Sequence, residues 1–293
     1  MTKVLVLGSS GLLGSSISRA LDSKFELIGT HFRNSTISSS NNIYFDVSSP
    51  GMLEKIIYNV GPQYVINCIG ATSVEECELF PEKAMLLNAI FPYRVAKASR
   101  DFDFQFLHIS TDHFSNPVGE IRDESMQPIP LNSYGYSKYV GERLVLNVNP
   151  KSLILRTNFF GVSTRGDHSL LDFAIKSFSG LTPIFGYEDV WFTPLGVNQI
   201  ANFLASALES THHGILNLSG TEAVTKLSFL REVARALGLD PNLVRAAKSS
   251  QFPSSVVRPL NLSLDNSKLL RLGVDLPSLK DMIREELSYR VVV

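Results

Sequence analysis

The sequence has few cysteines and no long apolar run, and each of these absences excludes a class of protein. Only Cys68 and Cys77 occur among 293 residues, and their spacing matches neither a zinc motif nor Cys-x-x-Cys. We therefore expect two reduced, buried thiols in a cytoplasmic protein. No apolar stretch approaches the roughly 20 residues that span a bilayer, and the N-terminus shows no secretory signal, so we expect no membrane association.

Neither positive nor negative charge is in excess. Formal net charge is -1, from 27 basic and 28 acidic residues. This balance provides no general attraction to nucleic acid or to an anionic membrane, and we expect neither as a partner. With 44% hydrophobic and 19% charged residues, the composition is that of an ordinary globular protein with one large domain or two unequal ones.

The first 160 residues alternate short apolar runs with helical patterns. Strands are expected at Val4–Leu7, Glu26–Thr30, Tyr64–Cys68, Phe104–Ser110 and Leu153–Arg156. Helices are expected between them at Leu12–Leu21, Met52–Asn59, Pro81–Arg100 and Ser133–Leu146. This alternation predicts an α/β fold with a doubly wound parallel sheet, a Rossmann fold.

The pattern changes after about residue 160, where loops carry glycine and proline and helical patterns dominate. Amphipathic helices are expected at Gln199–Leu208, Lys226–Leu237 and Leu279–Leu287. We therefore predict a dinucleotide-binding domain at 1–160. A smaller, mostly helical C-terminal substrate subdomain is predicted at 161–293, partly interleaved with the first.

A glycine-rich segment, Gly8-Ser9-Ser10-Gly11-Leu12-Leu13-Gly14, follows the first expected strand and opens the first expected helix. Glycine there lets the backbone approach a pyrophosphate, and the helix N-terminus supplies free N–H groups. The alternative is a turn that needs small residues only for packing. The residues expected to hold a dinucleotide here are Gly8, Ser10, Gly11, Leu12, Leu13 and Gly14.

The end of the second strand indicates which dinucleotide is bound. An NAD-specific fold usually places an acidic residue there for the ribose 2′-hydroxyl, but residues 29–33 contain none. The guanidinium of Arg33 suits a 2′-phosphate, so NADP(H) is preferred over NAD(H), although Arg33 could instead be a solvated loop cation. Asp46 follows the short run Ile43–Phe45 and is placed where it could recognise the amino group of an adenine.

The pattern Tyr-x-x-x-Lys occurs twice, at Tyr134 and Lys138 and again at Tyr93 and Lys97. On a helix, either spacing brings a phenol and an ammonium to one face. Tyr134 follows a polar loop, and Ser133 is placed to cap its helix. The other pair lies well inside an apolar helix and is interpreted as packing.

A residue with a hydroxyl group lies before the first pair in the sequence. This residue is Thr111, which directly follows the strand expected at Phe104–Ser110. Tyr134 can donate a proton to a carbonyl oxygen, and Lys138 would stabilise the resulting phenolate and bind the nicotinamide ribose. Thr111 would donate a hydrogen bond to the same oxygen, although it could also be satisfied by its own turn. These residues predict redox chemistry on a carbonyl or an alcohol.

With these motifs in order, the chain resembles the extended short-chain dehydrogenase/reductases and, more narrowly, the dTDP-4-dehydrorhamnose reductase family. The resemblance spans nearly the whole chain and is most specific in the last of its stretches, which lies in the substrate subdomain. The stretches that carry it are Val65–Cys68 leading to Ala71-Thr72, Leu131–Glu142, Leu155–Asn158 and Arg258–Asn261 through Leu264-Asp265.

The family implies hydride transfer from a reduced nicotinamide to the C4 ketone of a nucleotide-linked 6-deoxy sugar, with Thr111, Tyr134 and Lys138 as catalytic residues. Beyond the glycine loop and Arg33, the residues expected near the cofactor are Asp46, Val47, Cys68, Ile69, Gly70, Asn88, Tyr134, Lys138 and Asn158. The residues expected near the substrate are Thr72, Thr111, Asp112, Asn158, Phe159, Trp191 and Arg258. Trp191 alone could equally be core packing.

One departure from the family pattern concerns metal binding and the assembly of subunits. Some relatives carry an acidic residue after the third glycine, implicated in a Mg²⁺ site between subunits, where this chain has Ser15-Ser16. We therefore predict no such metal and a monomer or weak homodimer. Two alternative functions stay open: a nucleotide-sugar epimerase or dehydratase that keeps NAD bound, and a non-catalytic NADP-binding regulatory subunit.

Overall fold

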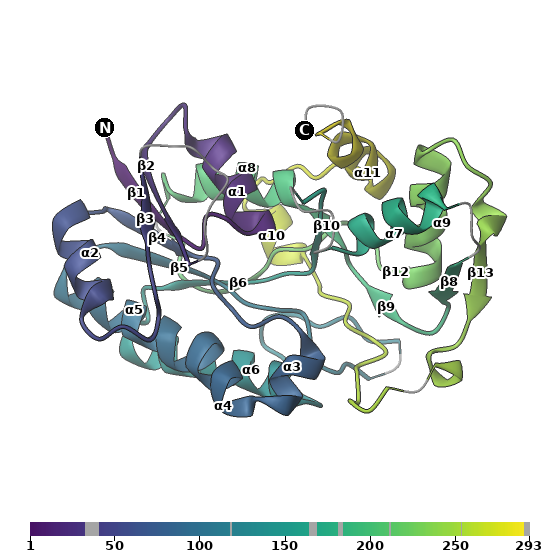
Figure 1. The fold of residues 1–293 in the computed structure, drawn as a ribbon, viewed down its shortest axis with the longest axis horizontal. Coiled ribbons are helices and arrows are strands. Elements are labelled where there is room, and N and C mark those ends of the chain that lie inside the picture. Colours follow the sequence, from purple (N-terminus) through teal and green to yellow (C-terminus); the bar gives the residue numbers. More distant parts are fainter. Residues whose placement is uncertain are drawn as a thin grey trace. The chain divides into compact units, whose positions relative to one another are not determined.

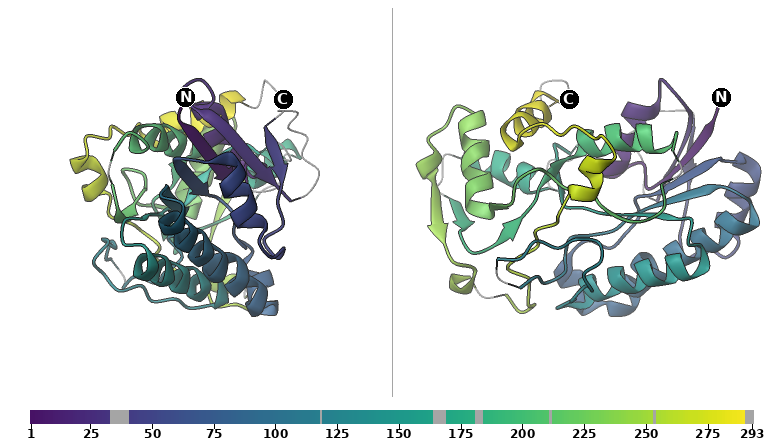
Figure 2. Two further views of the ribbon diagram at one scale, coloured as in Figure 1. Left: turned by 90° about the vertical axis from the view of Figure 1, so that its left-hand side faces the viewer. Right: turned by 180° about the vertical axis from the view of Figure 1, so that it is seen from behind.

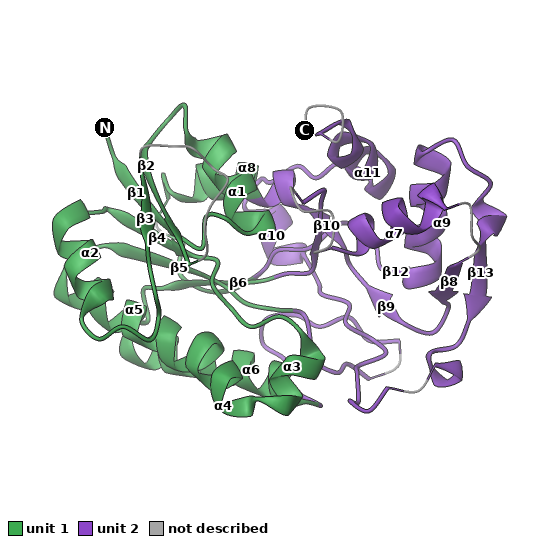
Figure 3. Ribbon diagram, viewed as in Figure 1, with its two compact units in different colours: residues 1–111, 132–156, 201–216 green, residues 112–131, 157–200, 217–293 purple. Residues whose placement is uncertain are grey.

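The computed structural model describes residues 1–32, 41–117, 119–163, 169–180, 184–210, 212–252 and 254–289 (Figures 1 and 2). The chain forms two compact units (Figure 3). Unit 1 comprises residues 1–111, 132–156 and 201–216, and unit 2 comprises residues 112–131, 157–200 and 217–293. The two units are interleaved in the chain, because residues 112–131 belong to unit 2 and residues 201–216 return to unit 1.

A parallel sheet is the frame of unit 1, and its described strands follow the order β11-β6-β5-β4-β1-β2-β3. They are β1 (Lys3–Leu7), β2 (Glu26–His31), β3 (Asn42–Tyr44), β4 (Tyr64–Asn67), β5 (Gln105–Ile109), β6 (Leu153–Arg156) and β11 (Gly214–Asn217). The pairings from β3 across to β6 are all parallel. The predicted doubly wound sheet is confirmed. Its strand order reverses between β1 and β4, the position where such folds bind ligands.

Helices cover the sheet, and their bounds agree closely with the sequence pattern. They are α1 (Leu12–Leu21), α2 (Met52–Val60), α3 (Val74–Leu79), α4 (Pro81–Met85), α5 (Phe91–Asp101) and α6 (Ser133–Val148). Helix α8 (Val197–Ala207) begins in unit 2 and ends in unit 1.

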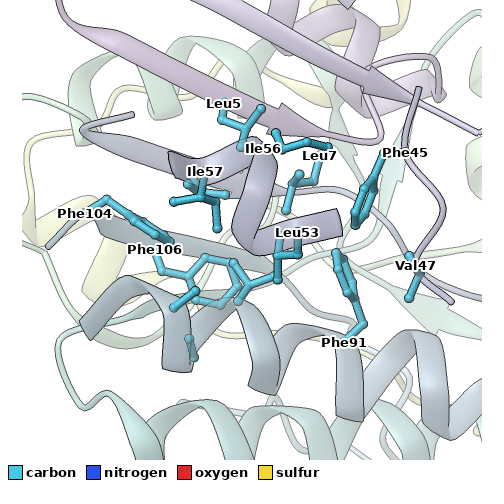
Figure 4. Packing of buried hydrophobic residues seen from close by; sticks show 14 of the residues in the cluster. Leu5, Leu7, Phe45, Val47, Leu53, Ile56, Ile57, Phe91, Phe104 and Phe106 are labelled. Carbon is cyan, nitrogen blue, oxygen red and sulfur yellow. The ribbon is translucent and has the colours of Figure 1, made fainter. Parts of the chain in front are cut away.

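One face of the sheet is closed by an apolar cluster that joins β1, β4 and β5 to α2, α5 and α6 (Figure 4). The cluster includes Leu5 and Phe106 from the strands and Ile57 and Phe91 from the helices, and all four are at most 1% exposed. Burying a side chain of this size contributes about 1.5–3 kcal/mol. The continuous apolar strands therefore reflect a sheet that is covered rather than solvated on this face.

The helix predicted at Pro81–Arg100 is interrupted by a π-helical turn, Leu86–Ile90. Pro92 has no N–H to offer the carbonyl of Asn88 one turn earlier, which favours this irregularity. Helix α6 packs on the turn at Gly141, where an added methyl group would overlap the Asn88 carbonyl oxygen. The absence of a side chain at Gly141 therefore sets how closely α6 approaches the turn.

Unit 2 combines helices with short two-stranded sheets. Its strand pairs are β7 (Phe159–Phe160) with β10 (Leu195–Gly196), β8 (Ile184–Tyr187) with β13 (Val244–Ala247), and β9 (Trp191–Phe192) with β12 (Val224–Thr225). Its helices include α7 (Leu170–Ser179), α9 (Lys226–Ala236), α10 (Ser267–Arg271) and α11 (Leu279–Ser288).

A buried arginine, Arg122, organises residues 112–131 within unit 2. Its guanidinium donates to Asn116 Oδ1 at 2.7 Å and to the carbonyls of Ser115 and Gln127 at 2.6 and 2.8 Å. Its backbone N–H donates to the Ser263 carbonyl at 2.9 Å. The segment before α6 is thus tied to the distant stretch that carries the most specific part of the resemblance.

Replacing Gly141 with alanine should lower the free energy of unfolding by about 1–3 kcal/mol, because the new methyl group displaces α6 from the π-helical turn. Denaturant unfolding followed by circular dichroism measures this change. Asn147→Ala, at an exposed position of the same helix, is the control and should change stability by less than about 0.5 kcal/mol. Equal effects in the two variants would contradict the packing role of Gly141.

Candidate active site

The glycine loop has the geometry that a dinucleotide phosphate requires. Gly8 lies at φ +84°, a conformation that side-chain-bearing residues rarely adopt. Helix α1 begins after Gly11, and no capping side chain accepts from its first N–H groups. Uncapped N–H groups at a helix N-terminus are a suitable site for a phosphate. The residues present therefore fit the predicted cofactor.

Two other predicted cofactor residues, Cys68 and Ile69, lie against Gly8. Leu13 is 3% exposed and belongs to the buried core. Val47 is also buried, whereas Thr72, predicted for the substrate, is exposed. Their roles toward a ligand stay predictions.

Arg33, which is predicted to select the cofactor, lies outside the described residues. Phe32 and Tyr44 are both more than half exposed, and their rings stack with centroids 6.3 Å apart. The carboxylate of Asp46 accepts from the hydroxyl and the N–H of Ser48 at 2.7 and 2.8 Å, which lowers the pKa of Asp46. The proposed reading of adenine by Asp46 stays a prediction.

The cap of helix α6 differs from the one predicted. Asn132 is the N-cap, and its Oδ1 accepts from the Gly135 N–H at 3.0 Å. Ser133 is instead the first helical residue, so its predicted capping role is wrong. Both side chains suit an N-cap, and only the backbone shows which residue precedes the first helical turn.

The catalytic residues predicted from sequence lie on two neighbouring elements of unit 1. Lys138, 5% exposed, donates from Nζ to the carbonyl of Ile109, the last residue of β5, at 3.1 Å. Thr111 follows two residues later and is 4% exposed. Tyr134 lies one turn before Lys138 on α6 and is partly buried. The structure thus brings the predicted lysine to the strand end that carries the predicted threonine.

Burial lowers the pKa of Lys138 to about 8, and the carboxylate of Glu142 acts in the opposite direction. A lysine with such a pKa is charged at neutral pH and is poorly screened by water. Lys97 of the second Tyr-x-x-x-Lys pair is exposed on α5. The two pairs therefore differ in the burial of the ammonium, which favours the pair on α6.

Asn88 joins the loop after β4 to helix α6. Its Oδ1 accepts from the Ala71 N–H at 2.9 Å, and its Nδ2 donates to the Ala71 carbonyl and to Ser137 Oγ, both at 3.0 Å. A methyl group added to Gly70 would lie 3.1 Å from Lys138 Nζ. The backbone of this loop, which is predicted to contact the cofactor, therefore passes beside the Lys138 ammonium.

Two predicted substrate residues meet in unit 2. Asn158 donates from Nδ2 to Asp112 Oδ2 at 2.7 Å. Its carbonyl accepts from the Leu195 N–H at 3.0 Å, beside the pairing of β7 with β10 that includes Phe159. Asp112 directly follows Thr111 in the chain, so the same loop leads from a predicted catalytic residue to a predicted substrate residue.

Sequence reasoning missed two members of a charged cluster in unit 2, Lys226 and His113. Lys226 Nζ lies 3.3 Å from the centre of the Phe192 ring. Burial lowers its pKa to about 8, with the Asp112 carboxylate raising it and Arg258 lowering it. Burial, aided by Arg258 and Lys226, lowers the pKa of His113 to about 4. The sequence carries no signal for this cluster, because strand pairing brings Lys226 to Phe192.

Trp191 lies on β9 beside the most specific stretch of the resemblance. Its backbone N–H donates to the Leu260 carbonyl at 2.7 Å, and its backbone carbonyl accepts from the Leu262 N–H at 2.9 Å. The indole is 45% exposed, so Trp191 is not core packing. A role in binding the nucleotide stays a prediction.

A model of one protein family, described as the RmlD substrate binding domain, matches residues 1–289. The chain belongs to this family. The assignment confirms the resemblance inferred from the sequence, and the match extends through both units.

Several curated relatives of this RmlD-family chain are named reductases. A probable low-salt glycan biosynthesis reductase of Haloferax volcanii is 29% identical over 94% of each chain. The dTDP-4-dehydrorhamnose reductase of Mycolicibacterium smegmatis is 27% identical over 93% of this chain and 80% of its own. A dTDP-4-dehydrorhamnose reductase of Bacillus anthracis, solved in complex with NADP, shares the fold with a TM-score of 0.86, 21% identity and 99% coverage of both chains.

No helix within the described ranges has the length and apolar character to cross a membrane. The same ranges contain no group of three or more His, Cys, Asp or Glu side chains placed to hold a metal. Both cysteines are free, and Cys77 is buried as predicted, whereas Cys68 is only partly buried.

A buried ion pair holds α6, which carries the predicted residues Tyr134 and Lys138, to the sheet. Glu142, one turn after Lys138 on α6, accepts from Arg156 at 2.7 and 2.9 Å and from the Ser110 hydroxyl at 2.6 Å. The two charged side chains are 1–2% exposed. Ser110 immediately precedes Thr111, so this network fixes both elements that carry the predicted catalytic residues.

Replacing Glu142 with glutamine should lower the free energy of unfolding by about 3–5 kcal/mol, because the buried Arg156 guanidinium loses its counter-charge. Denaturant unfolding measures this loss. Glu232 pairs with Arg235 at 2.8 Å on α9, and Arg235 is 55% exposed. Glu232→Gln is therefore the matched control, with an expected cost below about 1 kcal/mol. Similar costs for the two pairs would show that burial does not strengthen the Glu142 contact.

Proposed function

We propose that this chain is an NADPH-dependent reductase of the C4 ketone of a nucleotide-linked 6-deoxy sugar, similar to dTDP-4-dehydrorhamnose reductase. Its place would be in the biosynthesis of dTDP-rhamnose or a related polysaccharide precursor. The observation that carries the proposal is the buried Lys138 ammonium at the end of β5, one turn after Tyr134. Family membership and the reductase relatives support it.

The chemistry follows from these side chains. When bound, a reduced nicotinamide supplies the hydride that adds to the ketone carbon. Tyr134 donates its Oη proton to the carbonyl oxygen as negative charge develops there. Lys138 stabilises the phenolate that remains, and Thr111 donates a hydrogen bond to the same substrate oxygen. Asn88 bonds to Ser137 of α6, and Glu142 of the same helix bonds to Arg156, so these contacts would hold the donors in position before the substrate arrives.

NADP(H) is the proposed cofactor, and two observations support it. Residues 29–32 contain no acid that would select the ribose 2′-hydroxyl, and Arg33 follows them. The Bacillus anthracis relative was solved with NADP. The backbone of the glycine loop would hold the pyrophosphate, with Gly70 beside the nicotinamide end.

Tyr134→Phe should reduce kcat by at least about a hundredfold, because the proton donor is lost while the packing surface of the ring is kept. The rate is measured as loss of NADPH absorbance with a dTDP-4-keto-6-deoxyhexose. NADPH affinity, measured by fluorescence titration, should be unchanged.

Tyr93→Phe is the matched control, because Tyr93 belongs to the other Tyr-x-x-x-Lys pair on α5. It should leave kcat within about twofold. Full activity in the Tyr134 variant, or an equal loss of kcat in both variants, would contradict the assignment of Tyr134 as the proton donor.

Arg33→Ala should lower kcat/KM for NADPH by about tenfold or more and leave kcat/KM for NADH nearly unchanged. The guanidinium would contact only the 2′-phosphate, and a hydrogen bond to a charged group is worth about 1.5–3 kcal/mol. Steady-state kinetics with both cofactors gives the ratio, with NADH as the internal control. Parallel losses with the two cofactors would assign cofactor selection to another residue.

A further inference from the structure

A buried polar pair, Asn67 and His108, joins two neighbouring strands of unit 1. Asn67 is the last residue of β4 and lies opposite His108 of β5 in the parallel sheet. Both residues are 0% exposed. Val65 and Phe106, two residues earlier on the same face of each strand, are apolar and equally buried. A polar pair at this position therefore needs a physical reason.

Hydrogen bonds connect the pair to the loop that follows β4. Asn67 Oδ1 accepts from the Ile69 N–H at 3.0 Å, and Asn67 Nδ2 lies 3.1 Å from His108 Nδ1. Ile69 in turn lies against the glycine loop, since a methyl group added to Gly8 would be 3.0 Å from Ile69 Cγ1. Contacts thus run from His108 through Asn67 to the backbone beside Gly8.

These bonds determine which nitrogen of His108 carries the proton. The Ile69 N–H can only donate, so it identifies the Asn67 oxygen and leaves the Asn67 amide N–H groups to face His108. Nδ1 of His108 must then accept, and the ring proton is on Nε2. Burial lowers the pKa of His108 well below its usual value, and the Lys138 charge lowers it further, so the ring is neutral at pH 7.

The neutral ring has a cost that packing alone does not explain. Its Nε2 atom is buried, and none of the described residues forms a hydrogen bond with it. A buried N–H without a partner costs free energy, which a leucine of similar size would avoid. The ring stacks on Phe106 with centroids 6.0 Å apart, a contact that an apolar side chain could also make. Only the Nδ1 acceptor is beyond the reach of a leucine.

We propose that His108 is a positioning residue for the nicotinamide dinucleotide. As the neutral Nε2–H tautomer it holds the Asn67 amide, and Asn67 fixes Ile69 beside the glycine loop. This inference rests on the proposed function, because it takes the dinucleotide as the ligand.

The far end of the same loop has a separate anchor. Asn88 bonds to both the N–H and the carbonyl of Ala71, at 2.9 and 3.0 Å. Loss of the His108 acceptor should therefore loosen the loop at Ile69, next to the glycine loop, and leave Ala71 in place. We expect cofactor affinity to depend on His108 more strongly than the rate of the chemical step does.

The first test identifies the tautomer in the ligand-free protein. Nitrogen-15 NMR at pH 7 should show a neutral ring protonated at Nε2 for His108. The chain has six histidines, and the signals missing from His108→Asn identify this one. A proton on Nδ1, or a charged ring, would overturn the proposal, because Nδ1 could not then accept from Asn67.

The second test measures NADP+ affinity by isothermal titration calorimetry. His108→Leu should weaken binding by about tenfold, because the Asn67 amide loses its acceptor. His108→Asn should stay within about threefold of wild type, because its Oδ1 can accept where Nδ1 did, although the smaller side chain packs less well. Phe106→Leu is the packing control on the same face of β5 and should leave affinity within about twofold. Denaturant unfolding of each variant shows that it is folded.

The third test asks whether His108 acts through Asn67. In an Asn67→Ala background, adding His108→Leu should change NADP+ affinity by less than about twofold. With a dTDP-4-keto sugar, His108→Leu alone should raise KM for NADPH by about tenfold and change kcat by less than about threefold, because Asn88 still holds Ala71.

The outcomes decide separately on His108 and on the proposed function. Unchanged NADP+ affinity in His108→Leu, equal losses in the leucine and asparagine variants, or additive losses with Asn67→Ala would overturn the role of His108. The expected tautomer and affinities, together with no reduction of keto sugars by the wild type, would support His108 and reject the reductase function. A wild-type protein that binds neither NADP+ nor NAD+ would overturn both.

Discussion

The buried ion pair between Glu142 and Arg156 is the constraint on which the site in unit 1 depends. Tyr134, Lys138 and Glu142 are spaced four residues apart on α6, so they lie along one face of the helix. Glu142 fixes the far end of this face to β6 through Arg156 and to the end of β5 through Ser110. A displaced or rotated helix would bury both charges without partners, which costs several kcal/mol. The face that carries the predicted catalytic residues therefore has one stable position.

A second set of contacts supports the same helix. The π-helical turn at Leu86–Ile90 presents Asn88 to the loop at Ala71 and to Ser137 of α6. Gly141 allows the helix to pack on that turn. Lys138 thus lies between two polar networks, one through Asn88 and one through Glu142. Its ammonium is kept in a dry position, where its charge acts strongly on a neighbouring phenolate.

Unit 2 is organised around a buried cation of its own. Arg122 ties residues 112–131 to the stretch around Ser263, so the segment that begins at Asp112 is anchored within this unit. Asp112 itself accepts from Asn158 at 2.7 Å, which holds the start of the segment. Each unit therefore uses a buried arginine, Arg156 in unit 1 and Arg122 in unit 2, to fix a segment that carries predicted site residues.

The sequence by itself determined the sheet, the glycine loop and the choice of Tyr134 with Lys138. Apolar strands such as Tyr64–Asn67 and the cap-bearing start of α6 are local patterns, and local patterns can be read without tertiary contacts. Even so, the cap itself was misplaced by one residue, because both Asn132 and Ser133 suit that position.

Only the tertiary structure decided the rest. The helix pattern from Pro81 onward concealed the π-helical turn, although Pro92 was a local hint of it. Contacts and not sequence order assign residues 112–131 to unit 2. In the sequence, Lys226 resembles any other lysine of a helix. Only the pairing of β12 with β9 places its ammonium over Phe192. The properties of a charge depend on what surrounds it, and its surroundings here come from residues distant in the chain.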